Sequence, residues 1–389
     1  MEIASKELER AASLCGRCIK MCRHVCTVHR VTRNDADTPN HRAYIAYQAS
    51  ERGAFLPEEV PYMFAKCANC GLCEEWCETP GMNPGDTPGI DVGALMLAAR
   101  ADIVQQGLAP QTAVDLNCHV INQGNPYGEV QSARSSALSD AIAALPDTAE
   151  MLYFIGCDTT YRQPEIALAA IKVLKAANID FTVIKQGELC CGEPQYLLGF
   201  RQDALETARR NAELIAKTGA SKIVFNCPSC LKTFKQDYPE WGAQLPQNLE
   251  FLHLTELLTQ ILAEGKITLF KEVKKRVTYH DPCELGRKQG IYDAPREVIA
   301  SIPGLEFAEM LRSGSKADCC GAGGALSATN FPVVVEASKS TIQMAEDVSA
   351  QYLLTACPTC KQSFSRHTLR SDALETLDIV EVIAMAAGL

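Results

Sequence analysis

The cysteines are the residues of this chain best suited to chemistry. There are 19 of them among 389 residues, and most stand in short clusters. In a reducing compartment such density indicates metal or redox chemistry, and the odd count and tight C-x2-C spacings argue against a disulfide framework. The two N-terminal clusters are Cys15, Cys18, Cys22 and Cys26, followed by Cys67, Cys70, Cys73 and Cys77.

The second of these clusters has the spacing C-x2-C-x2-C-x3-C, which is typical of bacterial ferredoxins. In two-cluster ferredoxins the fourth cysteine of each run binds the other [4Fe–4S] cluster. This rule predicts two cubane clusters, one held by Cys67, Cys70, Cys73 and Cys26, the other by Cys15, Cys18, Cys22 and Cys77. The first run has one extra residue, and neither fourth cysteine directly precedes a proline, so the exchange of fourth ligands stays open. Two four-thiolate zinc sites are the alternative.

The remainder of the chain contains an internal repeat. The segments "MLYFIGCD", "GELCCGEP" and "KIVFNCPSCLKTF" recur in the same order as "RVTYHDPCE", "KADCCGAGG" and "YLLTACPTCKQSF". Equivalent cysteines are 126 to 130 residues apart. Matching segments in one order at a nearly constant distance predict duplication of one structural unit.

Within each repeat, short apolar runs alternate with helical stretches. This alternation predicts an α/β fold in which each repeat forms a parallel sheet covered by helices on both faces. The cysteines stand at or just after the expected strand ends, and parallel sheets bind ligands at that edge. We therefore expect five thiols to meet in each repeat.

The adjacent cysteine pairs are the most unusual part of this pattern. Neighbouring residues of a strand point to opposite faces, so Cys190–Cys191 and Cys319–Cys320 must lie in turns to reach one site. Gly192 and Gly321 follow directly, and a missing side chain permits close approach of the backbone to a cluster. A four-cysteine zinc site with one spare thiol in each repeat is the alternative.

These motifs resemble a known family. Residues 150–389 are similar to two consecutive CCG domains, and the whole chain resembles the catalytic iron–sulfur subunit of heterodisulfide reductase, with glycolate and lactate oxidase iron–sulfur subunits as related cases. The resemblance implies an N-terminal helical ferredoxin-like domain with two cubanes over 1–135, a first CCG domain over 136–270 and a second over 271–389.

The resemblance also implies two noncubane [4Fe–4S] clusters with five cysteine ligands each. The first set is Cys157, Cys190, Cys191, Cys227 and Cys230, and the second is Cys283, Cys319, Cys320, Cys357 and Cys360. The paired cysteines would then take part in catalysis. His280, three residues before Cys283, is a candidate proton or hydrogen-bond donor, with a structural histidine as the alternative.

Charge and hydropathy limit the location and partners. The formal charge is −10 and no basic patch is visible, which argues against nucleic-acid binding. Apolar runs are too short to span a membrane and the N-terminus does not read as a signal peptide, so we expect a cytoplasmic protein, with docking to a membrane complex left open. No G-x-G-x-x-G or Walker motif is present, so flavin or nucleotide is expected on a partner.

Cys118 belongs to no cluster and is expected to be a small buried residue.

Two functions fit these sites. In the first, the cubanes deliver electrons to two noncubane clusters that face each other across the repeat and cleave a disulfide. In the second, the chain is an electron-transfer module that connects a flavoprotein with another redox protein, as in a hydroxy-acid dehydrogenase or a bifurcating acyl-CoA-linked complex, without a disulfide substrate. A structural zinc protein is the third alternative.

Overall fold

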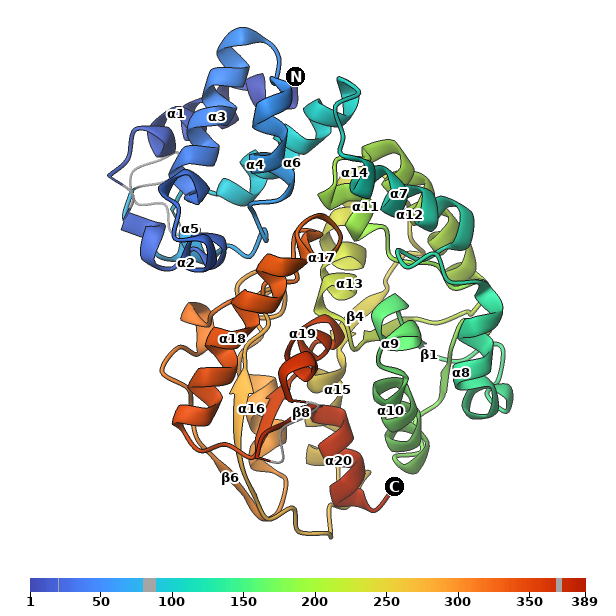
Figure 1. Cartoon of the computed structure of the whole chain (residues 1–389). Coiled ribbons are helices and arrows are strands. Elements are labelled where there is room, and N and C mark those ends of the chain that lie inside the picture. The colour runs from blue at the N-terminus through green and yellow to red at the C-terminus, as the bar shows by residue number, and fades with distance from the viewer. Residues whose placement is uncertain (20, 80–88, 369–372) are drawn as a thin grey trace. The chain divides into compact units, whose positions relative to one another are not determined.

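The computed structural model describes residues 1–19, 21–79, 89–368 and 373–389 (Figure 1). It divides into two compact units, each assembled from separate stretches of sequence. Unit 1 comprises residues 1–118, 194–201 and 312–341, and unit 2 comprises residues 119–193, 202–311 and 342–389. The three domains that the sequence predicts, over 1–135, 136–270 and 271–389, stay a prediction beside this division.

Unit 1 is helical. Its main helices are α1 (Lys6–Gly16), α2 (Thr27–Thr32), α3 (Pro39–Arg52), α4 (Val60–Phe64), α5 (Leu72–Glu75), α6 (Val92–Gln105) and α17 (Leu326–Thr329). Helix α3 begins at Pro39, directly after the capping residue Thr38. The hydroxyl of Thr38 accepts a hydrogen bond from His41 N. A helical N-terminal region that carries the cysteines was predicted and is confirmed.

A buried cation connects the separate stretches of unit 1. Arg100 in α6 is fully buried, and its guanidinium donates hydrogen bonds to the backbone carbonyls of Met63, Phe64, Cys67, Leu197 and Gly324. The distances from nitrogen to oxygen are 2.7 to 3.4 Å. Because five carbonyl dipoles surround the charge, the cost of burying it is offset by charge-assisted hydrogen bonds.

Unit 2 contains two four-stranded parallel sheets of the same topology. The first has the order β2-β1-β3-β4 and the second β6-β5-β7-β8. The strands of the first are β1 (Met151–Phe154), β2 (Phe181–Thr182), β3 (Lys222–Phe225) and β4 (Glu250–His253). Those of the second are β5 (Lys275–His280), β6 (Leu305–Phe307), β7 (Tyr352–Thr355) and β8 (Glu375–Asp378). The predicted duplication into parallel α/β sheets is confirmed.

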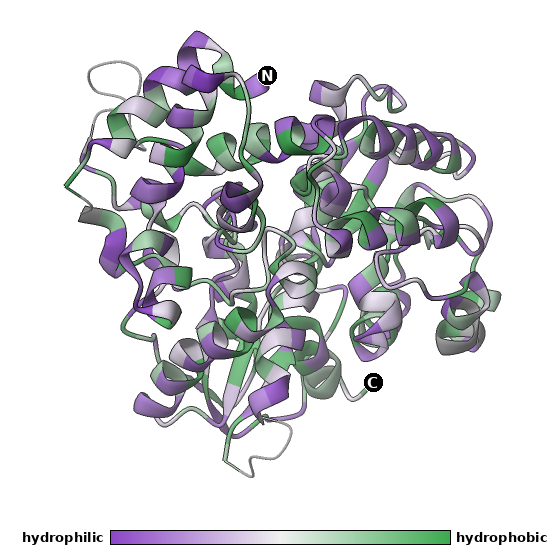
Figure 2. Cartoon of the chain, turned by 45° about the horizontal axis from the view of Figure 1, so that its top comes forward, coloured by the Kyte–Doolittle hydropathy of each residue, from purple (hydrophilic) through white to green (hydrophobic). Residues whose placement is uncertain are grey.

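Helices connect and cover the strands. They are α8 (Gln131–Ala143), α9 (Cys157–Tyr161), α10 (Pro164–Ala176), α11 (Glu193–Leu197), α12 (Arg201–Ala216), α13 (Pro228–Lys232), α14 (Tyr238–Trp241), α15 (Leu254–Ala263), α16 (Asp293–Ala300), α19 (Pro358–Thr368) and α20 (Ile379–Ala387). Helices α7 (Gln111–Gln123), α11, α12 and α18 (Phe331–Asp347) each contain a boundary between the units. Many helices carry both hydrophilic and hydrophobic bands (Figure 2).

One hydrophobic core serves both sheets. It includes Tyr153 of β1 and Ile171 of α10 from the first repeat, and Tyr279 of β5 and Ile383 of α20 from the second. The repeats therefore share a core within unit 2. None of the helices in the described ranges is both long and apolar enough to cross a membrane.

The last strand of each sheet ends in a residue that caps the next helix. His253 precedes α15 and Asp378 precedes α20, and in both helices a glutamate three residues later completes the capping box. His253 is buried, and burial lowers its pKa to about 4, so the imidazole is neutral at pH 7. Burial raises the pKa of Asp378 to about 7, and its Oδ1 accepts a hydrogen bond from Val380 N at 3.0 Å.

The raised pKa of Asp378 predicts a pH-dependent stability. Between the usual Asp value of about 3.9 and 7, the folded protein holds a proton that the unfolded chain has lost, so stability falls as pH rises through this range. Asp378→Asn keeps the capping acceptor and removes the titration. We expect the variant to match the wild type near pH 4 and to exceed its thermal stability at pH 8, as measured by melting temperature.

The matched control is Glu375→Gln, which changes an exposed carboxyl group of the same strand. It should follow the wild-type pH profile. A D378N variant that is less stable than wild type by the same amount at both pH values would contradict this account.

Candidate iron–sulfur sites

The first repeat brings its five predicted ligands together. Cys157 begins α9 after β1, Cys190 and Cys191 follow β2, and Cys227 and Cys230 follow β3 at α13. The thiol groups form an unbroken chain of contacts in the order Cys157, Cys190, Cys191, Cys230, Cys227. A single bound group could therefore contact all five sulfur atoms.

The thiols at this edge strongly affect each other's protonation. Hydrogen bonds with Cys157 and Cys191, together with burial, raise the pKa of Cys190 well above its usual value. Hydrogen bonds from Cys190 and Cys230 lower the pKa of Cys191 well below its usual value. The lowered pKa of Cys191 favours its thiolate, which is the form of cysteine that binds metal.

A buried carboxylate fixes the turn that contains the cysteine pair. Glu188 Oε1 and Oε2 accept hydrogen bonds from Gly156 N at 2.9 Å and Ile155 N at 3.3 Å, directly before Cys157. Arg134 pairs with Glu188 at 3.2 Å, and both side chains are buried. Glu188 thus joins the cysteine-pair turn to the loop of Cys157. The sequence analysis did not identify Glu188 as a site residue. The only indication in the sequence was its position, two residues before the cysteine pair.

The carbonyl groups of the cysteine pair are also held in place. Asn211 Nδ2 donates to Cys190 O at 2.8 Å, and Tyr238 Oη donates to Cys191 O at 2.9 Å. Cys190 N donates to Gly124 O at 2.6 Å. The segment "GNPYGE" over 124–129 therefore contacts the turn as well as connecting parts of the chain.

The glycine after each cysteine pair has a conformational function. Gly192 and Gly321 have φ values of +88° and +86°, in the region that favours glycine. A Cβ at Gly192 would lie 3.3 Å from Ala204 O, and one at Gly321 would lie 2.7 Å from Ala337 Cβ. The structure shows that each glycine adopts a left-handed backbone and lies against a helix, α12 for Gly192 and α18 for Gly321, and their role in close approach to a cluster stays a prediction.

The second predicted set is divided between the two units. Cys283, Cys357 and Cys360 follow β5 and β7 in unit 2, whereas Cys319 and Cys320 belong to unit 1. All five are buried. Their convergence on a second noncubane cluster stays a prediction.

His280 occupies a position of the core. It is 1% exposed, and its ring packs edge-on against Phe364 with the centroids 4.7 Å apart. The equivalent residues of the first repeat, Phe154 and Phe234, are also in ring contact, with centroids 4.8 Å apart. The location of His280 favours the structural alternative, and its catalytic role stays a prediction.

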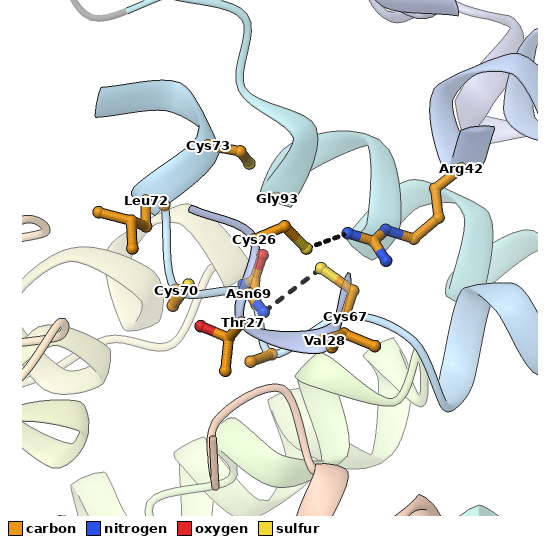
Figure 3. Close-up of a pocket in the computed structure, with 12 residues that line it drawn as sticks. Cys26, Thr27, Val28, Arg42, Cys67, Asn69, Cys70, Leu72, Cys73 and Gly93 are labelled. Carbon is orange, nitrogen blue, oxygen red and sulfur yellow. Dashed lines mark hydrogen bonds between the residues drawn. The ribbon is translucent and has the colours of Figure 1, made fainter. Parts of the chain in front are cut away.

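In unit 1, four of the N-terminal cysteines line one cavity (Figure 3). They are Cys26 from the first run and Cys67, Cys70 and Cys73 from the second. Asn69 N donates to Cys67 Sγ at 3.4 Å, and Arg42 Nη2 donates to Cys26 Sγ at 3.3 Å. The grouping is the one expected when two ferredoxin runs exchange their fourth ligands.

The other four N-terminal cysteines also lie near one another. Burial raises the pKa of Cys15, and the thiols of Cys22, Cys77 and Cys18 raise it further. Burial raises the pKa of Cys22 to about 12, with contributions from Cys26, Cys77 and Cys18. Cys77, from the second run, is thus a neighbour of the first run. Gly89 lies against it, because a Cβ there would be 2.7 Å from Cys77 Sγ.

The donor sets fit iron–sulfur clusters. The cavity of Cys26 contains the buried guanidinium of Arg42, whose Nε has no hydrogen-bond partner among the described residues. A cluster with thiolate ligands and inorganic sulfides carries negative charge and offers sulfur acceptors to such a cation. Among the described residues no three Cys, His, Asp or Glu side chains are placed to bind a single metal ion.

The prediction that Cys118 is buried is wrong. The side chain is exposed. Helix α7 buries Ala113, Leu116 and Val120 on one face, and Cys118 lies on the opposite face of the helix. An isolated cysteine carries no sequence signal of its face, which only the register of the helix determines.

Comparison with known proteins agrees with this arrangement. Residues 151–235 and 277–365 match the CCG family, described as a cysteine-rich domain. One subunit of the dihydromethanophenazine:CoB–CoM heterodisulfide reductase from Methanosarcina barkeri is 35% identical over 330 residues, which cover 83% of this chain and 78% of that protein. The chain belongs to the CCG family and is related to this heterodisulfide reductase subunit. The resemblance seen in the sequence is therefore confirmed, and the chain is a relative of iron–sulfur oxidoreductase subunits.

More distant relatives have other descriptions. One subunit of the fumarate reductase (CoM/CoB) from Methanothermobacter marburgensis is 30% identical, with 87% of this chain and 64% of that protein aligned. The probable iron–sulfur-binding oxidoreductase FadF of Bacillus subtilis is 28% identical, with 88% of this chain and 49% of that protein aligned. Proteins related to this chain thus occur with different named reactions.

The turn conformation predicts the effect of a methyl group at Gly192. A left-handed residue other than glycine costs about 1–2 kcal/mol, and the new Cβ would also press against Ala204 O. We expect Gly192→Ala to lower the melting temperature and the iron and sulfide content of the anaerobically purified protein.

Gly187→Ala is the matched control, because Gly187 has φ +75° and no atom lies within 4 Å of the place that a Cβ would take. It carries the conformational cost without the contact. Equal losses of iron in the two variants would show that the contact with α12 is unimportant for the site.

Proposed function

We propose that this chain is a disulfide-reducing iron–sulfur subunit. Cys15, Cys18, Cys22 and Cys77 would hold one cubane, and Cys26, Cys67, Cys70 and Cys73 the other. Noncubane clusters would be held by Cys157, Cys190, Cys191, Cys227 and Cys230, and by Cys283, Cys319, Cys320, Cys357 and Cys360. The substrate class is a low-molecular-weight mixed disulfide, as the name of the Methanosarcina relative states for that protein.

The observation that carries the proposal is a pair of reciprocal contacts between the repeats. Asp158, next to Cys157, accepts a hydrogen bond from Thr359, which lies between Cys357 and Cys360. Gln289, six residues after Cys283, donates at 3.0 Å to the carbonyl of Pro228, which lies between Cys227 and Cys230. The first cysteine loop of each repeat thus contacts the C-x2-C turn of the other. This arrangement suits a substrate whose central bond breaks into two similar halves.

Several contacts hold the residues beside the first site in place. Tyr127 donates to the Asp158 carboxylate, and the guanidinium of Arg162 lies 3.9 Å from the centre of the Tyr127 ring. Asp158 is thereby held from two sides, by Tyr127 and by Thr359. Preorganised ligand loops of this kind reduce the rearrangement needed when charge develops at the site.

The reaction needs two electrons from a partner. A disulfide accepts two electrons, its S–S bond breaks, and two thiolates leave and take protons from water. Bound iron–sulfur clusters supply the one-electron steps. We propose a flavoprotein or another iron–sulfur protein of the same complex as the electron donor. Cys190, Cys191, Cys319 and Cys320 are the proposed ligands nearest to the chemistry.

The test uses anaerobically purified full-length protein with a reduced viologen dye. Four [4Fe–4S] clusters correspond to about sixteen iron and sixteen sulfide per chain. We expect the mixed disulfide of coenzymes M and B to be reduced with two dye molecules oxidised per disulfide. Cys191→Ser should abolish turnover, while Cys118→Ser, which alters the exposed cysteine of α7, should retain it.

Protein that contains the expected iron and sulfide but reduces no disulfide would overturn the proposal. Rapid reduction by a co-purifying flavoprotein in that case would favour the electron-transfer module, to which the FadF relative points. Zinc without sulfide would contradict both functions.

A further inference from the structure

We propose that Arg42 is the built-in counter-ion of the cubane held by Cys26, Cys67, Cys70 and Cys73, and that it makes this cluster the higher-potential member of the N-terminal pair. The inference rests on the proposed ligand set. It assigns a function to a residue outside the cysteine motifs, and it gives the two cubanes different roles in electron transfer.

The guanidinium of Arg42 is held against the cavity from the side of α3. The side chain is 2% exposed, and Nη1 donates to the backbone carbonyls of Asp37, at 2.9 Å, and Lys66. Nη2 donates to Cys26 Sγ at 3.3 Å (Figure 3). The two backbone acceptors fix the orientation of the planar group, so its charge points at the cavity without rearrangement.

The positive charge is not neutralised by an acid. In the part of the chain that the structure describes, Arg42 forms no ion pair with a carboxylate, and its Nε has no hydrogen-bond partner. The nearest acidic residue in its network, Asp37, gives Arg42 only its backbone carbonyl and pairs through Oδ2 with Lys66 Nζ at 3.2 Å. A buried cation without a counter-charge is unfavourable, so the cavity is built for an anionic occupant.

Arg42 lies beside one of the two groups of thiols. It lines the same cavity as Cys26, Cys67, Cys70 and Cys73, and it donates a hydrogen bond to Cys26 Sγ at 3.3 Å. The lining of that cavity does not include Cys15, Cys18, Cys22 or Cys77. The charge therefore belongs to the cavity of Cys26.

A fixed positive charge stabilises the reduced cluster more than the oxidised one, because reduction adds one negative charge. Hydrogen bonds to ligand sulfur act in the same direction. The cluster of Cys26 is consequently reduced more easily than the cluster of Cys15. With clusters bound at both sites, the charge of Arg42 would favour electron transfer from the Cys15 site to the Cys26 site.

The experiment is a potentiometric titration of the full-length protein, monitored by the paramagnetic signals of the reduced cubanes. Arg42→Gln should lower the higher of the two cubane potentials and leave the lower one in place. We expect at least a tenfold change in the reduction equilibrium, which is about 59 mV for one electron. Arg42→Lys keeps the charge and should give a smaller shift in the same direction.

Arg10→Gln is the matched control, because it removes a positive charge from an exposed position of α1 in the same unit. It should leave both potentials unchanged. The wild-type protein tests the ligand set separately from Arg42. Absence of cubane signals from the wild type would contradict the ligand set. If the wild type shows both signals, the potentials of the variants test Arg42.

An R42Q protein with full iron and sulfide but wild-type potentials would overturn the assignment. If R42Q does not retain its clusters, the second neutral variant Arg42→Met decides: wild-type potentials overturn the proposal, and a lowered higher potential supports it. Loss of clusters from both variants would assign Arg42 to assembly of the site and would also overturn the tuning function.

Discussion

The sites of unit 2 depend on one constraint, which is that parallel strands end at the same edge of a sheet. Cysteines separated by more than thirty residues, such as Cys157, Cys191 and Cys227, can meet only because β1, β2 and β3 run in one direction. The constraint also explains why each cysteine follows the carboxyl end of a strand in the sequence, and why the adjacent cysteines 190 and 191 must lie in a turn. The helices and the core keep the strand ends in register, and the side chains of Glu188, Asn211 and Tyr238 then fix the loops.

Much of this organisation was predictable because it leaves periodic signals. The repeat, the alternation of strands and helices, and the clustering of cysteines each involve several residues in a fixed pattern. Single charged residues carry no such pattern. Glu188, Arg42 and Arg100 are isolated in the sequence, and their importance follows from backbone groups and thiols that distant segments bring to them. The face on which Cys118 lies is likewise decided by packing of α7.

The two repeats have kept their architecture while their interiors have diverged. His253 and Asp378 both cap the helix after the last strand, although one is a neutral base and the other a buried acid. Phe154 and His280 occupy equivalent places beside equivalent phenylalanines. Glu188 has Ala317 at the equivalent place of the second repeat, so the two cysteine-pair turns are supported differently. Duplication thus supplies matching backbones, and local substitutions make the environments of the two sites unequal.

The discontinuous construction of unit 1 has a consequence for synthesis of the protein. The cysteines at positions 15 to 77 leave the ribosome early, but the Arg100 guanidinium needs the carbonyls of Leu197 and Gly324 to satisfy its charge. Although domains of nascent chains generally fold in order from the N-terminus, this helical unit cannot reach its final packing until most of the chain has been translated. The early thiols therefore spend much of translation in an incomplete fold, and a cell that makes this protein has to keep them reduced throughout that interval.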